Sequence, residues 1–133
     1  MTSPQPRTPT PVGHAKAAAT ALQALTALHR AQLAANPADV YALVDELLPV
    51  VYELSRVYDR LAGQLNDWAD LASSRGRAGD VPQRLHTAAS QLGMHSANHA
   101  CWAHQRMEDA LAALDRPRYR ADRGIPLDWK PSR

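Results

Sequence analysis

Hydrophobic residues recur along most of this chain at intervals of three and four, which places them on one side of a helix. This pattern predicts three helices, over residues 13–35, 37–74 and 81–115. The apolar residues are mainly small or aliphatic, aromatic residues make up only 5% of the chain, and Phe is absent. Such a composition disfavours a β-sheet, in which β-branched and aromatic residues are enriched. The sequence therefore predicts an all-α protein.

The first predicted helix carries mostly small apolar residues on one side. They are Ala15, Ala18, Ala19, Leu22, Leu25, Thr26, His29 and Leu33. We interpret His29 on this stripe as a core histidine. Asn36 and Pro37 should end this helix and start the next, since Asn is a preferred N-cap and Pro suits the first helical position. A junction this short should make the first two helices antiparallel neighbours.

The second predicted helix contains Pro49, which must remove one backbone hydrogen bond. The apolar stripe keeps its phase across Pro49, so we expect one kinked helix rather than two. The stripe consists of Val40, Leu43, Val44, Leu47, Val50, Val51, Leu54, Tyr58, Leu61, Ala62, Leu65, Trp68, Ala69 and Ala72.

The third predicted helix follows a loop over residues 73–79. Asp80, with Gln83 three residues later, resembles a capping box. The apolar stripe is formed by Leu85, Ala88, Ala89, Leu92, Ser96, His99, Ala100, Ala103, Met107, Ala110 and Leu114. Because most of these side chains are small, we expect this helix to approach its neighbours closely.

The helix lengths predict an antiparallel three-helix bundle with a long, extended helical hairpin. At ~1.5 Å per residue, the first helix is too short to cover residues 61–96 of the other two. Two helices alone leave apolar side chains uncovered there, and an exposed apolar patch usually marks an interaction site. The predicted contact residues are Leu61, Leu65, Trp68, Leu85 and Leu92. We expect a homodimer or another helical protein as the partner.

Both ends of the chain are predicted to lie outside the helical domain, residues 13–116. Residues 1–12 contain four prolines and are expected to form a disordered arm. Residues 117–133 show no period and should form an irregular basic tail. A basic cluster at its start suggests, as an alternative function, a nucleic-acid-associated accessory protein; its residues are Arg116, Arg118, Tyr119, Arg120 and Arg123. The strong bias of this chain toward Arg over Lys favours instead a solvated tail that the acidic second helix partly neutralises.

His95 and His99 are four residues apart, a spacing that can place two imidazoles on one metal ion. A metal-binding helical protein is therefore a further alternative. The favoured interpretation is structural, with His99 hydrogen-bonded to Tyr58 or backbone at the edge of the core and His95 solvated. Arg106 nearby also disfavours a cation. We accordingly predict no metal and no cofactor.

The remaining residue types do not form a catalytic pattern. Cys101, the single cysteine, is expected to face solvent without a histidine to serve as its base. No phosphate-binding glycine loop, catalytic triad or pair of inward carboxylates is apparent, so we predict no enzyme. No signal peptide and no apolar run of ~18–20 residues is apparent, which suggests a cytoplasmic protein away from the membrane. The sequence thus predicts a non-catalytic helical interaction module.

Overall fold

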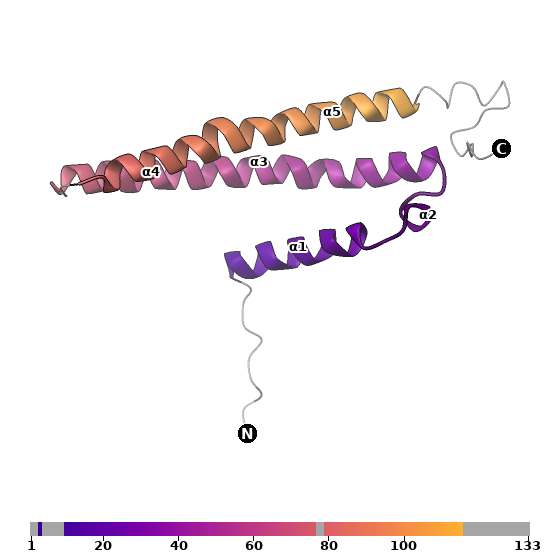
Figure 1. Cartoon of the computed structure of the whole chain (residues 1–133), viewed down its shortest axis with the longest axis horizontal. Helices are drawn as coiled ribbons and strands as arrows, with labels where there is room; N and C mark the ends of the chain where they lie inside the picture. Colours follow the sequence, from indigo (N-terminus) through magenta and orange to yellow (C-terminus); the bar gives the residue numbers. More distant parts are fainter. Residues whose placement is uncertain (1–2, 4–9, 77–78, 116–133) are drawn as a thin grey trace. The chain divides into compact units, whose positions relative to one another are not determined.

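A computed structural model describes residue 3 and residues 10–76 and 79–115, which form helices and the turns between them (Figure 1). No strand occurs within these ranges, so the prediction of an all-α fold is confirmed. The chain divides into two units, residues 1–35 and 36–133. Packing of the first helix on the other two, as in a three-helix bundle, stays a prediction, as does the division into three segments.

Helix α1, Pro11–Thr26, begins the described part of the first unit. The Oγ1 atom of Thr10 caps it by accepting a hydrogen bond from the backbone N–H of Gly13 over 3.0 Å. Pro11 lies in the first turn, where a backbone N–H has no helical partner in any case. The helix starts two residues before the predicted boundary, so Pro11 and Val12 belong to it. The other residues of the predicted arm, except Ser3 and Thr10, lie outside the described part of the chain.

The continuous helix predicted over residues 13–35 is wrong. Helix α1 ends at Thr26, and a short helix α2, Arg30–Leu33, follows it. His29 precedes α2 with an extended backbone, and its N–H donates to Gln32 Oε1 over 3.1 Å. This local bond stabilises a new helix start at the expense of a continuous one. His29 is exposed there, so its interpretation as a core histidine is wrong too.

Helix α3, Pro37–Ser74, has the predicted bounds. The Oδ1 atom of Asn36 accepts a hydrogen bond from the backbone N–H of Asp39 over 3.0 Å, which is the predicted N-cap. Pro49 lies inside the helix, which continues through it without interruption. The prediction of one helix rather than two is confirmed.

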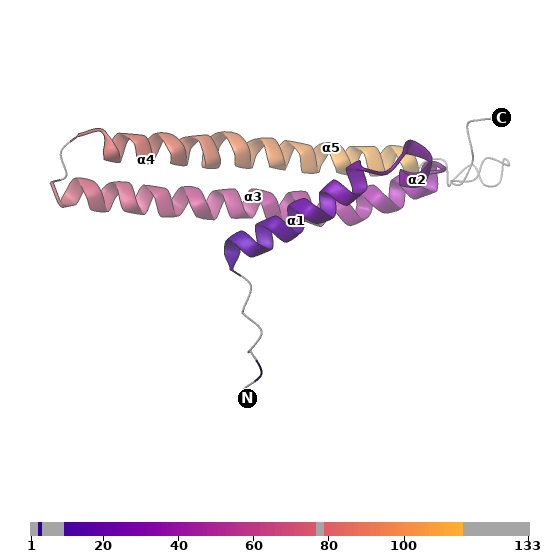
Figure 2. The same cartoon turned by 60° about the horizontal axis from the view of Figure 1, so that its bottom comes forward.

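The second arm of the hairpin runs from α4, Val81–Ser90, through a π-helical segment η1, Gln91–Ser96, into α5, Ala97–Asp115. It lies antiparallel beside α3 along its length (Figure 2). Gly76 and Gly79 in the connection have φ angles of 65° and 104°, a region that a Cβ disfavours.

Asp80 precedes α4 but makes no capping hydrogen bond through its side chain, so the predicted capping box is wrong. Its φ of −90° and ψ of 3° differ from the extended backbone of a capping residue. The backbone carbonyl of Asp80 still accepts a hydrogen bond from the N–H of Arg84, over 2.8 Å. The helix is therefore started by its backbone alone.

One row of residues on α3 packs against the second arm, and we call it the inner row. Its members are Tyr41, Val44, Leu48, Val51, Ser55, Tyr58, Ala62, Leu65, Ala69 and Ala72, all buried or half-buried. The intervals alternate between three and four, which is the heptad pattern of helices that pack side by side.

The second arm presents a matching facing row. Its members are Pro82, Leu85, Ala89, Gly93, Ala97, Ala100, His104, Met107, Leu111 and Leu114. From Ala89 to Ala97 the row takes eight residues, where a heptad takes seven. One extra residue in an α-helix would turn all later side chains by ~100°. The wider π turn of η1 absorbs that residue, so the row continues toward α3.

The structure corrects part of the predicted stripe, and the extra residue accounts for the differences after η1 but not for Ala88, which precedes it. Ala88, His99, Ala103 and Ala110 were expected to face the interior and are exposed. Ala97 and His104, one position further along, were not expected there and are buried and half-buried. A strict period of 3.6 residues does not anticipate a π turn.

The buried core of the described residues consists of five alanines, Ala62, Ala69, Ala89, Ala97 and Ala100. Small side chains let helix axes approach closely, as predicted for this face. Larger apolar side chains lie around the contact and keep part of their surface in solvent.

Candidate interaction surface

Helix α3 carries a second apolar row, each member one position before a member of the inner row, and we call it the outer row. It consists of Val40, Leu43, Leu47, Val50, Leu54, Val57, Leu61, Gln64, Trp68 and Leu71. Its intervals also alternate between three and four. Every member from Val50 to Leu71 is exposed. The outer row is thus a heptad pattern that the hairpin itself does not cover.

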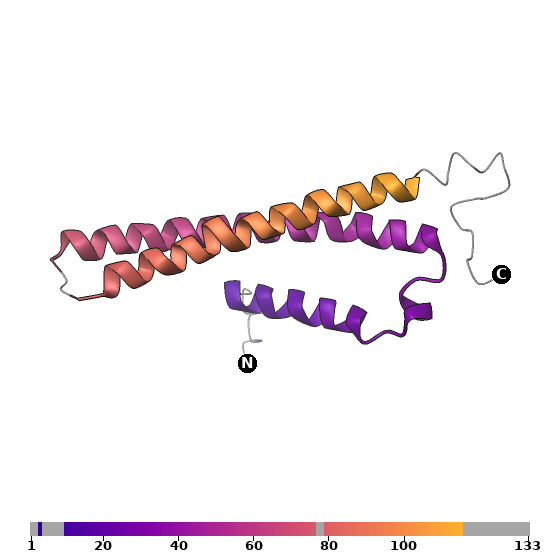
Figure 3. The same ribbon diagram turned by 45° about the horizontal axis from the view of Figure 1, so that its top comes forward.

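The geometry of a two-helix hairpin explains this exposure. The outer row is turned by ~100° from the inner row around the axis of α3. The inner row faces the second arm, which crosses over α3 in Figure 3, and the outer row does not. Leu61 is consequently 44% exposed and Trp68 51% exposed. One neighbouring helix covers one row, and α3 has two.

The second arm contributes to the same side of the hairpin. In antiparallel helices, one step back along either chain turns toward the same side. The row one position before the facing row therefore lies beside the outer row; it is Val81, Arg84, Ala88, Leu92, Ser96, His99, Ala103, Arg106, Ala110 and Ala113. Alanine and serine fill half of these positions. We call this row and the outer row together the docking face.

The opposite side of the hairpin is polar. His86 Nδ1 lies 3.0 Å from Asn66 Oδ1, and His86 Nε2 lies 3.7 Å from Asp70 Oδ1. These contacts connect α4 to α3 across the hairpin. Nearer the other end, the ring of His104 packs on Tyr52 with 5.8 Å between centroids. The hairpin therefore has two unlike sides, one apolar and one polar.

The five predicted contact residues occupy three kinds of position. Leu61 and Trp68 belong to the outer row and are exposed, whereas Leu65 and Leu85 are half-buried between the two arms of the hairpin. Leu92 is half-buried at the edge of the docking face.

The sequence reasoning did not single out Leu54, Val57 and Leu71, which the structure adds to this face. The signal that identifies them is the recurrence of large apolar residues at two heptad positions. Leu47, Leu54, Leu61 and Trp68 occupy one position, and Val50, Val57 and Leu71 belong to the other, which Gln64 interrupts.

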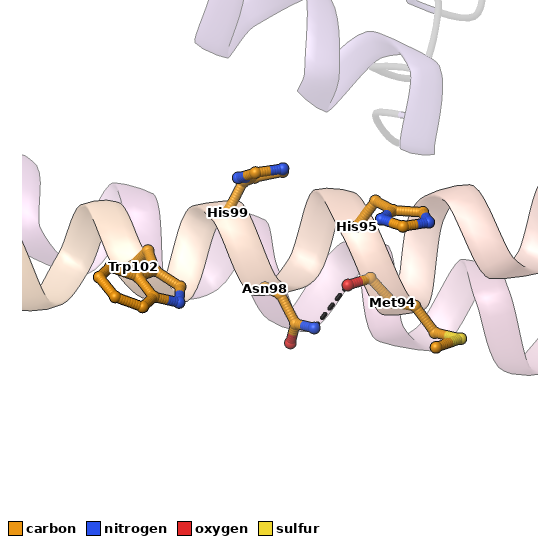
Figure 4. A pocket seen from close by; sticks show the side chains of 5 residues that line it. All are labelled: Met94, His95, Asn98, His99 and Trp102. Atoms are coloured by element: carbon orange, nitrogen blue, oxygen red, sulfur yellow. Dashed lines mark hydrogen bonds between the residues drawn. The ribbon is translucent and has the colours of Figure 1, made fainter.

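His95 and His99 line a surface hollow on the second arm, together with Met94, Asn98 and Trp102 (Figure 4). His95 lies in η1 and His99 in α5, and both side chains project from the same side of the helix (Figure 4). The Asn98 side chain turns away from them and donates a hydrogen bond to the carbonyl of Met94. The structure therefore brings the two predicted imidazoles to one place.

The structural interpretation of His99 is wrong. His99 is exposed rather than at the core edge, and within the described residues it makes no hydrogen bond with Tyr58. Arg106, the expected unfavourable neighbour, places Nη1 3.2 Å from Asp109 Oδ2 and its guanidinium 5.2 Å from the centre of the Trp102 ring. Its guanidinium thus lies beside Trp102, at one wall of the hollow, and is paired with a carboxylate. No group of three His, Cys, Asp or Glu residues suited to a metal lies within residues 10–76 and 79–115.

The other candidate side chains lie apart. Cys101 is exposed and its thiol is free, as expected. His104 Nδ1 lies 3.6 Å from Glu108 Oε1, one helical turn away, while His86 contacts α3 at the far end of the hairpin. The predicted basic cluster, residues 116–123, lies outside the described residues. Across the part of the chain that is described, no helix has the length and apolar character needed to cross a membrane.

Comparison of the chain with models of known protein families, with curated proteins and with solved structures found no match.

Proposed function

We propose that this protein is a non-catalytic helical interaction module that self-associates through its docking face. The observation that carries this proposal is the outer row, an exposed heptad pattern beside the row that already packs within the hairpin. A heptad pattern is suited to another helix, whose side chains interdigitate with it. The partner should therefore be helical.

A second copy of the hairpin meets this requirement. Each copy presents large apolar side chains on α3 and many small ones on the second arm. Two such faces related by a two-fold axis place large side chains of one copy against small ones of the other. The product is a four-helix bundle, a common arrangement for helical hairpins.

The size of the docking face fits a stable dimer. The outer row spans residues 40–71, which is about 47 Å of helix. At a helix width of about 10 Å, each arm offers on the order of 500 Å², and two arms about 1,000 Å². Specific interfaces bury ~800 Å² per partner. Helix α1, with 16 residues, is about 24 Å long and cannot cover the whole row in any placement.

The test compares two exposed tryptophans by light scattering over a range of concentrations. The wild-type chain, of 14.5 kDa, should show a dimer mass. Trp68→Ala should shift the equilibrium toward monomer, because a buried aromatic side chain stabilises by ~1.5–3 kcal/mol. Trp102→Ala is the matched control, since Trp102 is 62% exposed and lies outside the docking face. A wild-type monomer at high micromolar concentration, or equal effects of both variants, contradicts self-association.

The alternative partners give different outcomes. A wild-type monomer that a second helical protein captures, and that Trp68→Ala fails to bind, would favour another protein over a second copy. A salt-dependent complex with random-sequence DNA, lost on replacing Arg118 and Arg120, would favour the nucleic-acid alternative. Size-exclusion chromatography with and without DNA separates these possibilities.

A further inference from the structure

We propose that His95 and His99 form a two-imidazole site for a late first-row divalent cation, with Cu²⁺ the best fit. The two side chains are one helical turn apart, project from the same side of the second arm and line one hollow (Figure 4). The proposal concerns a single chain: His99 belongs to the docking face and His95 does not, so self-association should weaken Cu²⁺ binding rather than support it.

The π segment improves the alignment of the two rings. In a straight α-helix, four residues turn about 400°, so the second side chain overshoots the first by about 40°. Residues of a π turn rotate less per step, and η1 includes His95 and ends at Ser96. Part of the overshoot is therefore removed. His99 lies more nearly above His95 along the axis, which is the arrangement a bridging cation needs.

Both imidazoles are available. Neither makes a hydrogen bond or ion pair with another residue of the described ranges, whereas His86 and His104 each contact an acid. Both rings are exposed, so no buried packing must be broken to bind a cation. The pairing of Arg106 with Asp109 lowers the local positive charge that would repel one.

The donor set selects the class of metal. The described residues supply two nitrogen ligands and no third His, Cys, Asp or Glu, so water completes the coordination. A closed tetrahedral zinc site needs four protein ligands. Imidazole with water ligands suits tetragonal Cu²⁺ and, more weakly, Ni²⁺, and affinity in such sites is highest for Cu²⁺. Because only neutral imidazole binds a metal, binding should weaken in acid.

The test uses a full-length chain in which Trp102 is the reporter, with Trp68→Phe and Trp129→Phe. Trp102 lines the hollow with the two histidines, so bound Cu²⁺ should quench its fluorescence. One equivalent of copper sulfate should saturate the signal. Calorimetry on the unmodified chain should give the same stoichiometry, with Ni²⁺ and Zn²⁺ weaker than Cu²⁺.

Matched substitutions decide the outcome. His99→Ala should weaken Cu²⁺ binding by at least about tenfold, since even residues that only orient a metal ligand matter by ~10–100-fold. His14→Ala, which alters an exposed histidine on α1, should leave binding unchanged. Saturable binding that survives His99→Ala, or no binding by the wild-type chain, overturns the proposal.

A separate experiment distinguishes failure of this metal site from failure of the proposed self-association. Trp68→Ala should retain the one-to-one binding of Cu²⁺ while losing self-association. Loss of copper binding in that variant would mean that the site needs a second chain, against the proposal. If the wild-type chain binds copper but does not dimerise at any concentration, the proposed self-association is rejected. The proposed metal site is then still supported.

Discussion

Gly93 and Ala62 face each other across the hairpin: a Cβ added to Gly93 would lie 3.0 Å from the Cβ of Ala62. Neither atom can turn away, because each Cβ is fixed by its own backbone. A glycine inside a helix costs ~1 kcal/mol relative to alanine. Here it removes the one atom that would hold the helices apart.

Replacing Gly93 with alanine should destabilise the protein by about 1–2 kcal/mol, because the steric cost of overpacking exceeds the gain in helix propensity. Gly63→Ala is the matched control, since nothing lies within 4 Å of a Cβ added there. That variant should gain up to ~1 kcal/mol. Urea unfolding monitored by circular dichroism measures both, and equal stabilisation of the two variants would show that the contact is not tight.

The alanine core should not accept larger side chains. Ala69 is fully buried between the arms, so Ala69→Leu should cost ~1–3 kcal/mol through forced separation of the helices. Ala42→Leu, at an exposed position of the same helix, should change stability by less than ~0.5 kcal/mol. Urea midpoints at a fixed protein concentration measure both. A neutral Ala69→Leu variant would indicate a loosely packed hairpin.

Because η1 holds one residue more than the heptad pattern needs, single-residue deletions at different places in the second arm should reduce stability by different amounts. Removing Gln91, which is exposed, should convert η1 to α-helix and leave Gly93 and the facing row directed at α3. Removing Ala103 from α5 should instead turn the last four members of the facing row by ~100° and cost several kcal/mol. Thermal unfolding of the two deletion variants tests this, and equal loss of stability would refute the explanation of the π turn.

The His86–Asn66 contact should couple the two arms. A hydrogen bond of this kind contributes ~0.5–1.5 kcal/mol, less when exposed to solvent. A double-mutant cycle of His86→Ala and Asn66→Ala should therefore give a coupling energy of a few tenths of a kcal/mol or more. Arg56 and Glu53, an exposed pair within α3 at 3.4 Å, provide the comparison, with weaker coupling expected. Zero coupling for the first pair would show that the contact contributes nothing to stability.

The bounds of α3 could be predicted from sequence because local chemistry determines them. Asn36 supplies the cap, and the apolar stripe keeps its phase past Pro49. The break before Arg30 was missed since the leucines of that segment, Leu22, Leu25 and Leu33, continue a helical spacing across it. The bond from His29 to Gln32 that starts α2 leaves no mark on the hydrophobic pattern.

The candidate site was predicted only in part, for a related reason. The broad stripe read from α3 contains both the inner and the outer row, and a sequence does not say which of two adjacent rows meets a neighbour. Leu61 and Trp68 were predicted to be contact residues, and both lie exposed in the outer row. Leu65 was predicted with them but lies half-buried in the inner row, between the two arms of the hairpin. The position of His99 depended on the π turn, which a uniform helical period cannot reveal.

The five-alanine core has a thermodynamic consequence. Alanine side chains remove little apolar surface from water, so the hairpin by itself gains little free energy on folding. If the docking faces supply the rest, folding and assembly become one equilibrium, and the melting temperature rises with protein concentration. Each tenfold dilution then removes about 1.4 kcal/mol of stability. Under that condition the protein concentration, as well as the sequence, sets the temperature up to which the helices stay folded.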